Sequence, residues 1–176
     1  MNIRLETERL WLRPFVAEDL PAMIPIQLNP DVMRYVDDGK TCPPDQTKRF
    51  LQRNLDWSPH DPKGFLAIER KSDQALLGWC GLLSCEIEGV AETEIGYLLA
   101  KEAWGQGYAT ETTKKLLHHA FYTAHFTQLI AMTHPRNVPS QHVLHKCGFQ
   151  LEKRVTLPKG ERLIYRLISP IAKRNL

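Results

Sequence analysis

The sequence predicts one domain of the α/β (α+β) class, built on a mixed β-sheet. Two observations predict this class: β-like runs gather near both ends of the chain, and the middle holds a strand, a helix and a second strand in succession over residues 92–132. A strand–helix–strand unit joins parallel strands, whereas the C-terminal runs are separated by a short turn and suit a hairpin. The 176 residues suit a single domain over residues 1–176 that is large enough to fold alone.

The N-terminal segment is expected to form a strand and then an irregular helix. Residues 3–12 alternate in part between apolar and polar side chains, as a half-buried strand does. Residues 17–28 suit a helix with acidic side chains in its first turn, where they complement the helix dipole. Pro21 and Pro25 lie inside this segment, and proline lacks the N–H that a helix interior needs. The helix should therefore be short or irregular.

A second helix and three strands are expected before the middle of the chain. Residues 44–57 place Phe50, Leu51 and Leu55 on one face, which is the spacing of an amphipathic helix. β-like apolar runs follow at residues 65–70, 76–87 and 92–99.

The junction between the strand at 92–99 and the next helix is the most informative stretch of the chain. Gly105 and Gly107 lie in the short loop between them, and the helix runs to about His125 with a continuous apolar stripe. A helix N-terminus offers unpaired N–H groups and the positive end of the dipole, and glycine lets a ligand approach the backbone closely. The junction therefore predicts a site for a phosphate-bearing cofactor.

The C-terminal third is expected to hold a strand, a short helix and a hairpin. Residues 128–132 suit the strand that completes the parallel unit. A short helix follows Pro139 and ends near Gly148, a residue type that suits the left-handed position after a helix. The chain closes with two β-like runs at residues 149–155 and 162–168.

Composition and charge exclude several classes of protein. The chain is 43% hydrophobic and 24% charged, and its net charge of +3 comes from scattered basic residues, so no nucleic-acid partner is expected. No apolar run reaches membrane-spanning length and the charged N-terminus lacks a signal-peptide core, so we expect a cytoplasmic protein with no membrane partner. The four cysteines are irregularly spaced, and neither a disulfide framework nor a metal site is expected.

Two motifs at a fixed separation resemble those of the GCN5-related N-acetyltransferase (GNAT) superfamily. Its acetyl-CoA loop has the pattern Gln/Arg-x-x-Gly-x-Gly/Ala, which this chain matches at Gly107 and Ala109 and departs from at Trp104. The opening TERLWLRPFVAEDL and the stretch EIGYLLAKEAWGQGYATE are similar to the RimJ/RimL-like ribosomal-protein branch. A second signature, Asn-x-x-(Ala/Ser)…Gly-Phe, is matched by Asn137, Ser140, Gly148 and Phe149.

The resemblance spans nearly the whole chain and implies the GNAT fold, a mixed central sheet of about seven strands flanked by about four helices. It also implies acetyl-CoA as the cosubstrate, with direct transfer of the acetyl group to a bound amine. The implied cofactor contacts are Leu98, Leu99, Trp104, Gly105, Gln106, Gly107, Tyr108, Ala109, Thr110 and Asn137.

Acetyl transfer from a thioester requires a neutral amine, a hydrogen-bond donor for the developing oxyanion and a proton for the departing thiolate. Deprotonation at neutral pH costs about 4–5 kcal/mol for a lysine side chain and about 1 kcal/mol for an α-amine, from their unperturbed pKa values. The resemblance implies that Glu94 is the general base. Glu92, two residues earlier on the same strand face, is the alternative base. Both could instead be exposed strand carboxylates.

The departing thiolate has one candidate proton donor. Many members of the superfamily use a tyrosine seven residues after the asparagine, and Leu144 occupies that position here. In the RimL-like branch a serine three residues after the asparagine takes this role, which implies Ser140. Ser140 could instead bind the backbone of its own helical turn, and Asn137 could serve the turn rather than the pantetheine arm.

We therefore expect an acetyl-CoA-dependent N-acetyltransferase whose acceptor is a primary amine, with a protein N-terminal α-amine favoured. A small-molecule amine (a polyamine, an antibiotic or an amino acid) is the alternative acceptor, and a non-catalytic acyl-CoA-binding module is the alternative class. Met33 and Tyr35 are candidate substrate contacts, because in relatives the region after the first helix shapes the acceptor pocket; packing at the helix end is the alternative. The protein is expected to be a monomer or a homodimer.

Overall fold

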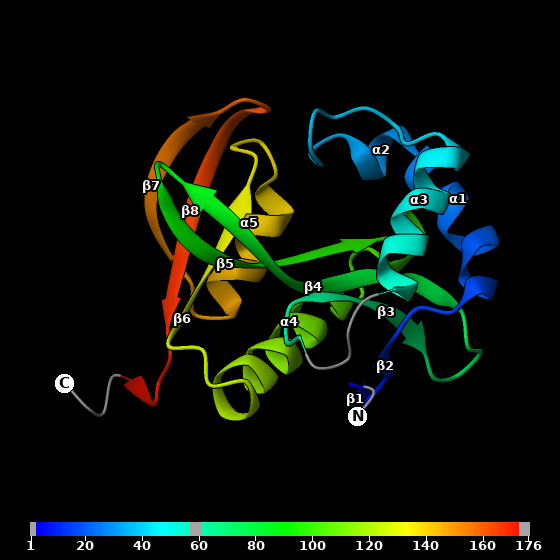
Figure 1. Ribbon diagram of the computed structural model, residues 1–176, viewed down its shortest axis with the longest axis horizontal. Helices are drawn as coiled ribbons and strands as arrows, with labels where there is room; N and C mark the ends of the chain where they lie inside the picture. Colours follow the sequence, from blue (N-terminus) through cyan, green and yellow to red (C-terminus); the bar gives the residue numbers. More distant parts are fainter. Residues whose placement is uncertain (1–2, 57–60, 173–176) are drawn as a thin grey trace.

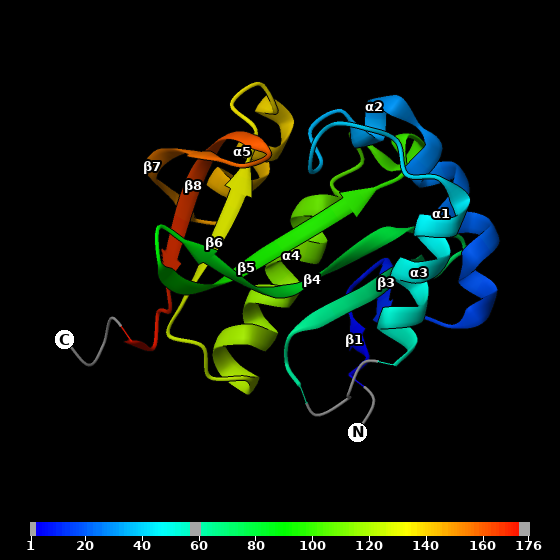
Figure 2. The ribbon, with the colours of Figure 1, turned by 45° about the horizontal axis from the view of Figure 1, so that its top comes forward.

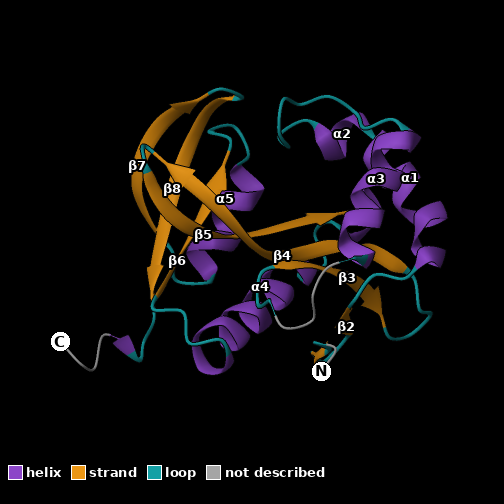
Figure 3. Ribbon diagram, viewed as in Figure 1, coloured by secondary structure: helices purple, strands orange, loops and turns teal. Residues whose placement is uncertain are grey.

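The computed structural model describes residues 3–56 and 61–172. At its centre lies one eight-stranded sheet in the order β1-β2-β3-β4-β5-β6-β8-β7 (Figures 1 and 3). All neighbouring strands in this sheet are antiparallel except β5 and β6, which are parallel. The predicted mixed sheet is confirmed, and its parallel step comes from the strand–helix–strand unit in the middle of the chain.

Each segment predicted from the sequence contains an observed element. The strands are β1 (Leu5–Glu6), β2 (Leu10–Arg13), β3 (Gly64–Arg70), β4 (Leu76–Ile87), β5 (Val90–Leu99), β6 (Gln128–Thr133), β7 (Gln150–Leu157) and β8 (Gly160–Ile168). The α-helices are α1 (Leu20–Leu28), α2 (Pro30–Met33), α3 (Pro44–Leu55), α4 (Tyr108–His118) and α5 (Val138–Lys146).

The first predicted strand, residues 3–12, is instead the tight hairpin β1–β2. The chain reverses at Thr7, whose backbone N–H donates to the Leu10 carbonyl at 3.0 Å and whose hydroxyl accepts from the Leu10 N–H at 2.9 Å. A polar side chain that bonds its own backbone in this way favours a turn over a continuous strand. This division gives eight strands where about seven were expected.

The helix ends also differ from the prediction. The predicted helix over 17–28 is followed by the separate α2, because Asn29 is extended, as a residue before proline prefers. The helix expected to reach His125 passes from α4 into a π-helical turn, His119–Thr123. Trp57, the predicted last residue of the helix over 44–57, lies outside the described residues.

Helices cover both faces of the sheet (Figures 1 and 2). Leu66 and Ile68 of β3 pack with buried side chains of α4 and α5, whereas the intervening Ala67 packs with Met23 of α1 and Leu51 of α3. This alternation is the period of two expected for a strand buried on both faces. The core is therefore split by the sheet into an α4–α5 side and an α1–α3 side.

Strands β5 and β6 separate soon after they meet. Their registered pairing consists of Glu94 and Ile130. Beyond that pair, β5 continues alongside β4 to Leu99, and β6 continues alongside β8 to Thr133. The two strands therefore spread apart in the middle of the sheet (Figure 2).

Candidate active site

A cleft of about 520 Å³ occupies the region where β5 and β6 diverge. Residues 94–98 of β5 and 131–133 of β6 line it. The loop at residues 35–37 and the β7–β8 turn border it on the α1–α3 side, and the start of α5 contributes Asn137 and Ser140. A space between two diverging strands leaves backbone edges free to bind an extended ligand.

Alternate residues of β5 face opposite sides of the sheet. Leu98 packs with the α1–α3 side of the core, whereas Ile95 and Tyr97 pack with the α4–α5 side. Glu94 is four residues before Leu98, an even number, and therefore faces the same α1–α3 side. The cleft can accordingly hold two ligands that approach each other from opposite faces of the sheet.

The loop between β5 and α4 has the features of an anion site. Gly105 and Gly107 have φ of +73° and +83°, left-handed values that glycine adopts without strain. Gly107 is the N-cap of α4, and none of the described side chains caps the helix, so the first-turn N–H groups have no side-chain acceptor in this part of the chain. A Cβ added at Gly105 would meet no atom of residues 3–56 or 61–172 within 4 Å. These features fit a pyrophosphate held by backbone N–H groups at the start of α4.

The other predicted cofactor residues surround this loop. The indole N–H of Trp104 donates to the Leu99 carbonyl at 3.0 Å and so ties the loop to the end of β5. The side chains of Leu98 and Leu99 are core, which leaves their backbone groups as the available contacts. Gln106 donates to the Glu102 carbonyl at 2.7 Å. The first turn of α4 contains Tyr108, Ala109 and Thr110.

The glycine loop and the start of α4 contact the N-terminal β1–β2 turn, which the sequence did not predict. Glu111 in α4 accepts from the Thr7 hydroxyl at 2.6 Å and from the Arg9 Nε at 2.8 Å. Arg9 also donates to the Gln106 carbonyl at 3.0 Å, and its guanidinium lies 4.3 Å from the centre of the Tyr108 ring. The β1–β2 turn therefore holds the glycine loop and the helix start in one arrangement.

Glu94 lies at the point of divergence, in a half-buried position. Burial raises the pKa of Glu94 to about 7, and a hydrogen bond with the backbone of Met132 opposes this effect. The negative charge of Asp37 raises this pKa further, and the positive charge of Arg162 lowers it. A carboxylate with a pKa near neutrality can be ionised and still accept a proton readily, as a general base must.

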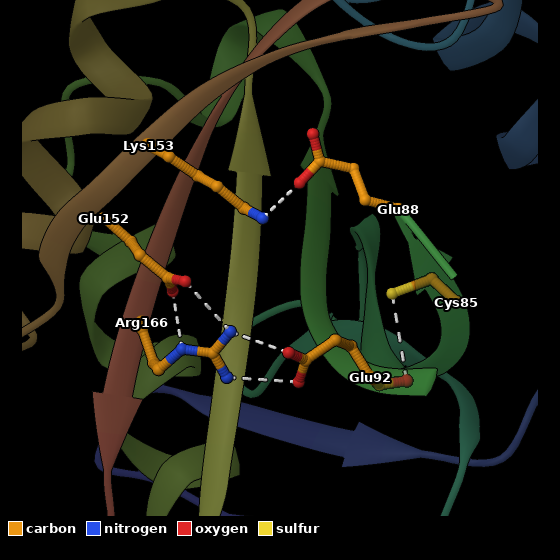
Figure 4. Close-up of polar contacts among 6 residues, drawn as sticks. All are labelled: Cys85, Glu88, Glu92, Glu152, Lys153 and Arg166. Atoms are coloured by element: carbon orange, nitrogen blue, oxygen red, sulfur yellow. Dashed lines mark hydrogen bonds and ion pairs between the residues drawn. The ribbon is translucent and has the colours of Figure 1, made fainter. Parts of the chain in front are cut away.

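Glu92, the alternative base, is held in an ion-pair network (Figure 4). Its oxygens accept from Nη2 and Nη1 of Arg166 at 2.6 and 3.2 Å, and its side chain is only 7% exposed. Arg166 also pairs with Glu152. These carboxylates raise the pKa of Arg166 above its ordinary value, so Glu92 faces a permanent cation. Glu94 has no such partner among the described residues, and the geometry therefore favours Glu94.

Ser140 and Tyr97 meet on the α4–α5 side of the cleft. The Ser140 hydroxyl lies 3.1 Å from the Tyr97 hydroxyl, within hydrogen-bond distance. Burial raises the pKa of Tyr97 to about 12, so the phenol keeps its proton. Asn137 is the N-cap of α5, where its Oδ1 accepts from the Ser140 backbone N–H at 3.3 Å. Leu144, in the usual tyrosine position, is buried core. The sequence contained Tyr97 but carried no sign that it meets Ser140.

Of the two residues predicted to contact the substrate, one lines the cleft and the other does not. Met33 is 5% exposed, packs in the α1–α3 core and does not line the cleft. Tyr35 does line it, and its ring stacks on His134 with centroids 5.0 Å apart. The same loop is joined to the β7–β8 turn, because Asp37 accepts from Lys159 at 2.8 Å. These contacts lie at the border of the cleft on its α1–α3 side.

Neither a metal centre nor a membrane span is found within residues 3–56 and 61–172. No three His, Cys, Asp or Glu side chains in these ranges converge as metal ligands would. No helix in the same ranges has both the length and the apolar character needed to cross a bilayer.

Comparison with known proteins identifies the family. Residues 9–150 match the model of an acetyltransferase (GNAT) domain. The chain is 31% identical over 157 residues to the uncharacterized protein YkkB of Bacillus subtilis (strain 168), covering 86% of this chain and 88% of that protein. It is 30% identical over 148 residues to the uncharacterized N-acetyltransferase p20 of Bacillus licheniformis, covering 84% and 83% of the two chains.

A solved structure shares the fold at lower identity. The RimL ribosomal L7/L12 alpha-N-protein acetyltransferase, in complex with coenzyme A, superposes with a TM-score of 0.79 at 18% identity, covering 95% of this chain and 98% of that chain. Fold, domain match and relatives agree: the chain belongs to the GNAT family and is an N-acetyltransferase.

Proposed function

We propose that the protein transfers the acetyl group of acetyl-CoA to a protein N-terminal α-amine and that it belongs to the RimJ/RimL-like branch. The observation that carries this proposal is the position of Glu94, a half-buried carboxylate with a pKa near neutrality at the divergence of β5 and β6. An α-amine loses its proton near the same pH, so Glu94 is matched to this acceptor, whereas a lysine amine needs a much stronger base.

Each face of the cleft has a separate task in the proposed mechanism. Acetyl-CoA supplies an activated acyl group, and the glycine loop with the start of α4 holds its pyrophosphate. Glu94 on the α1–α3 side takes the proton from the attacking amine, directly or through a water. Ser140 on the α4–α5 side donates a hydrogen bond to the departing sulfur, and Tyr97 holds the Ser140 hydroxyl in place. Asn137 fixes the turn that presents Ser140.

A small-molecule amine is the second candidate acceptor. The contacts of Tyr35 with His134 and of Asp37 with Lys159 border the α1–α3 end of the cleft. A cleft bordered in this way suits a compact amine as well as the first residue of a peptide. The two acceptor classes differ in the groups attached beyond the reacting amine, so a direct comparison separates them.

The test is acceptor-dependent release of coenzyme A thiol over a panel of N-terminal peptides, free amino acids and polyamines, with a reaction lacking acceptor as control. We expect release above the control with peptides, and mass spectrometry should find the acetyl group on the α-amine. Release with polyamines alone would favour the second candidate. Acetyl-CoA binding without release for any amine would identify a non-catalytic module instead.

A further inference from the structure

Arg162, at the start of β8, is a half-buried arginine without a carboxylate partner among the described residues. Its Nη2 donates to the backbone carbonyl of Asp37, and its Nη1 donates to the backbone carbonyl of Glu161 at 2.9 Å. The other half-buried arginines in the described chain all pair with carboxylates, namely Arg13, Arg70 and Arg166.

The unpaired charge of Arg162 lies on the α1–α3 side of the cleft, where the acceptor amine would approach Glu94. Arg162 and Glu94 both line the cleft, and Arg162 is close enough to lower the pKa of Glu94. A guanidinium has five N–H donors, of which the two backbone contacts use two. The remaining donors and the full positive charge are available to a ligand whose amine sits at Glu94.

The chemistry of the acceptors decides which of them fits this pair. An α-amine has a carbonyl or carboxylate oxygen on the adjacent carbon, and such an oxygen can accept from a guanidinium. A polyamine has a second cation instead, which Arg162 would repel. A lysine side chain has only methylene groups next to its amine.

We propose that Arg162 is a specificity-determining residue that binds the oxygen adjacent to the acceptor's α-amine. The acceptor is then an α-aminoacyl group, as found in a peptide N-terminus or a free amino acid, and polyamines and lysine side chains are disfavoured. This inference rests on the proposed acetyl transfer and deepens it, because it names the part of the acceptor that is recognised.

The sharpest test removes the polar groups of the first peptide bond of the acceptor. The best peptide of the N-terminal panel is compared with the same peptide whose first peptide bond is replaced by a trans carbon–carbon double bond. This replacement keeps the shape and removes the carbonyl oxygen together with the amide N–H, and the Arg162 variant below assigns the effect to the oxygen. Rates are expressed per neutral amine, because the two amines differ in pKa. Wild-type enzyme should prefer the carbonyl peptide in kcat/KM by about 10- to 150-fold, the range for one hydrogen bond to a charged group.

The variant Arg162→Gln should lose this preference, because it should slow reaction with the carbonyl peptide more than reaction with the alkene peptide. Arg162 also binds the backbone of the loop at residue 37, so its replacement loosens that loop. Lys159→Gln breaks another contact of the same loop and is the control for this effect. Lys159→Gln should lower kcat/KM for both peptides by the same factor. Arg154→Gln, an exposed arginine on β7 outside the cleft, should leave both rates unchanged. The melting-temperature shift with acetyl-CoA reports that each variant is folded.

Free amino acids, tested against the corresponding alkylamines, distinguish a small acceptor from a peptide. Equal wild-type rates on the two peptides would overturn the role of Arg162, and so would an equal loss on both peptides in Arg162→Gln. Transfer to polyamines or lysine side chains alone would also overturn it while leaving acetyl transfer intact. Absence of transfer to every amine would instead remove the proposed function itself.

Discussion

Glu94 and Ile130 form the registered pair between β5 and β6, and the two strands separate immediately beyond them. Because Glu94 is at this point, its carboxylate is partly withdrawn from water yet lies beside an open cleft. The same divergence leaves Tyr97, three residues later, on the opposite face beside Ser140. The proposed base for the amine and the proposed donor for the sulfur therefore both depend on one feature of the sheet.

The glycine loop should be required for acetyl-CoA binding. Acetyl-CoA binds the folded state and should raise the melting temperature by mass action. Gly107→Val should abolish this shift, because a side chain there would strain a φ of +83° and obstruct the space in which the pyrophosphate would lie. Gly89→Val is a matched control, since Gly89 has a φ of +81° but lies in the β4–β5 turn. Both variants should lose stability, but Gly89→Val should keep the shift. Normal binding by Gly107→Val would exclude the loop as the phosphate site.

Glu94→Gln should keep acetyl-CoA binding and lower kcat by about 10²–10⁴ near neutral pH, the usual range for loss of a general base. The deficit should shrink at high pH, where the amine is already neutral. A pH–rate profile of wild type and variant makes this comparison. A loss that does not change with pH would show that Glu94 positions the acceptor. Glu92→Gln is the paired control, because it disrupts the Arg166 network and should reduce stability more than it changes the pH profile.

The raised pKa of Glu94 also predicts how stability depends on pH. A carboxyl group whose pKa is higher in the folded than in the unfolded protein binds its proton more tightly when folded. Its contribution to stability is complete below the unfolded value near 4.5 and is lost as pH rises through about 7. The free energy of unfolding of Glu94→Gln, measured by urea denaturation, should therefore exceed that of wild type above pH 7. It should also lack the wild-type decline between these two values. Parallel curves for the two proteins would mean that Glu94 titrates normally.

The contact between Tyr97 and Ser140 should be visible in a double-mutant cycle. Ser140→Ala should lower kcat by a factor equivalent to roughly 1–3 kcal/mol, the scale of one lost hydrogen bond in a desolvated site, with acetyl-CoA affinity nearly unchanged. Tyr97→Phe should have a smaller effect, and the double variant should be no slower than Ser140→Ala, because Tyr97 acts through the serine. Additive losses would mean that the two hydroxyls act independently. Wild-type turnover in Ser140→Ala would leave Asn137 and Ser140 as a helix cap only.

Local patterns in the sequence predicted the strands, the helices and the glycine loop, because each depends on residues close together in the chain. The contacts that define the site join distant residues: Tyr97 and Ser140 are 43 positions apart, Glu92 and Arg166 74, and Arg9 and Glu111 102. No local periodicity encodes such pairs. The sequence therefore left Glu92 as an alternative to Glu94, and the long-range ion pair of Glu92 with Arg166 is one of the observations that favour Glu94. The burial of Met33 likewise depends on how α2 packs, which its neighbours in sequence do not determine.

The most direct measurement uses one peptide that carries both an N-terminal α-amine and an internal lysine. After incubation with acetyl-CoA and enzyme, tandem mass spectrometry locates the acetyl group. Wild-type enzyme should place it on the α-amine at neutral pH, Glu94→Gln should do so far more slowly, and the lysine should stay unmodified. Acetylation of the lysine, or of neither amine while acetyl-CoA still raises the melting temperature, would contradict the proposed function.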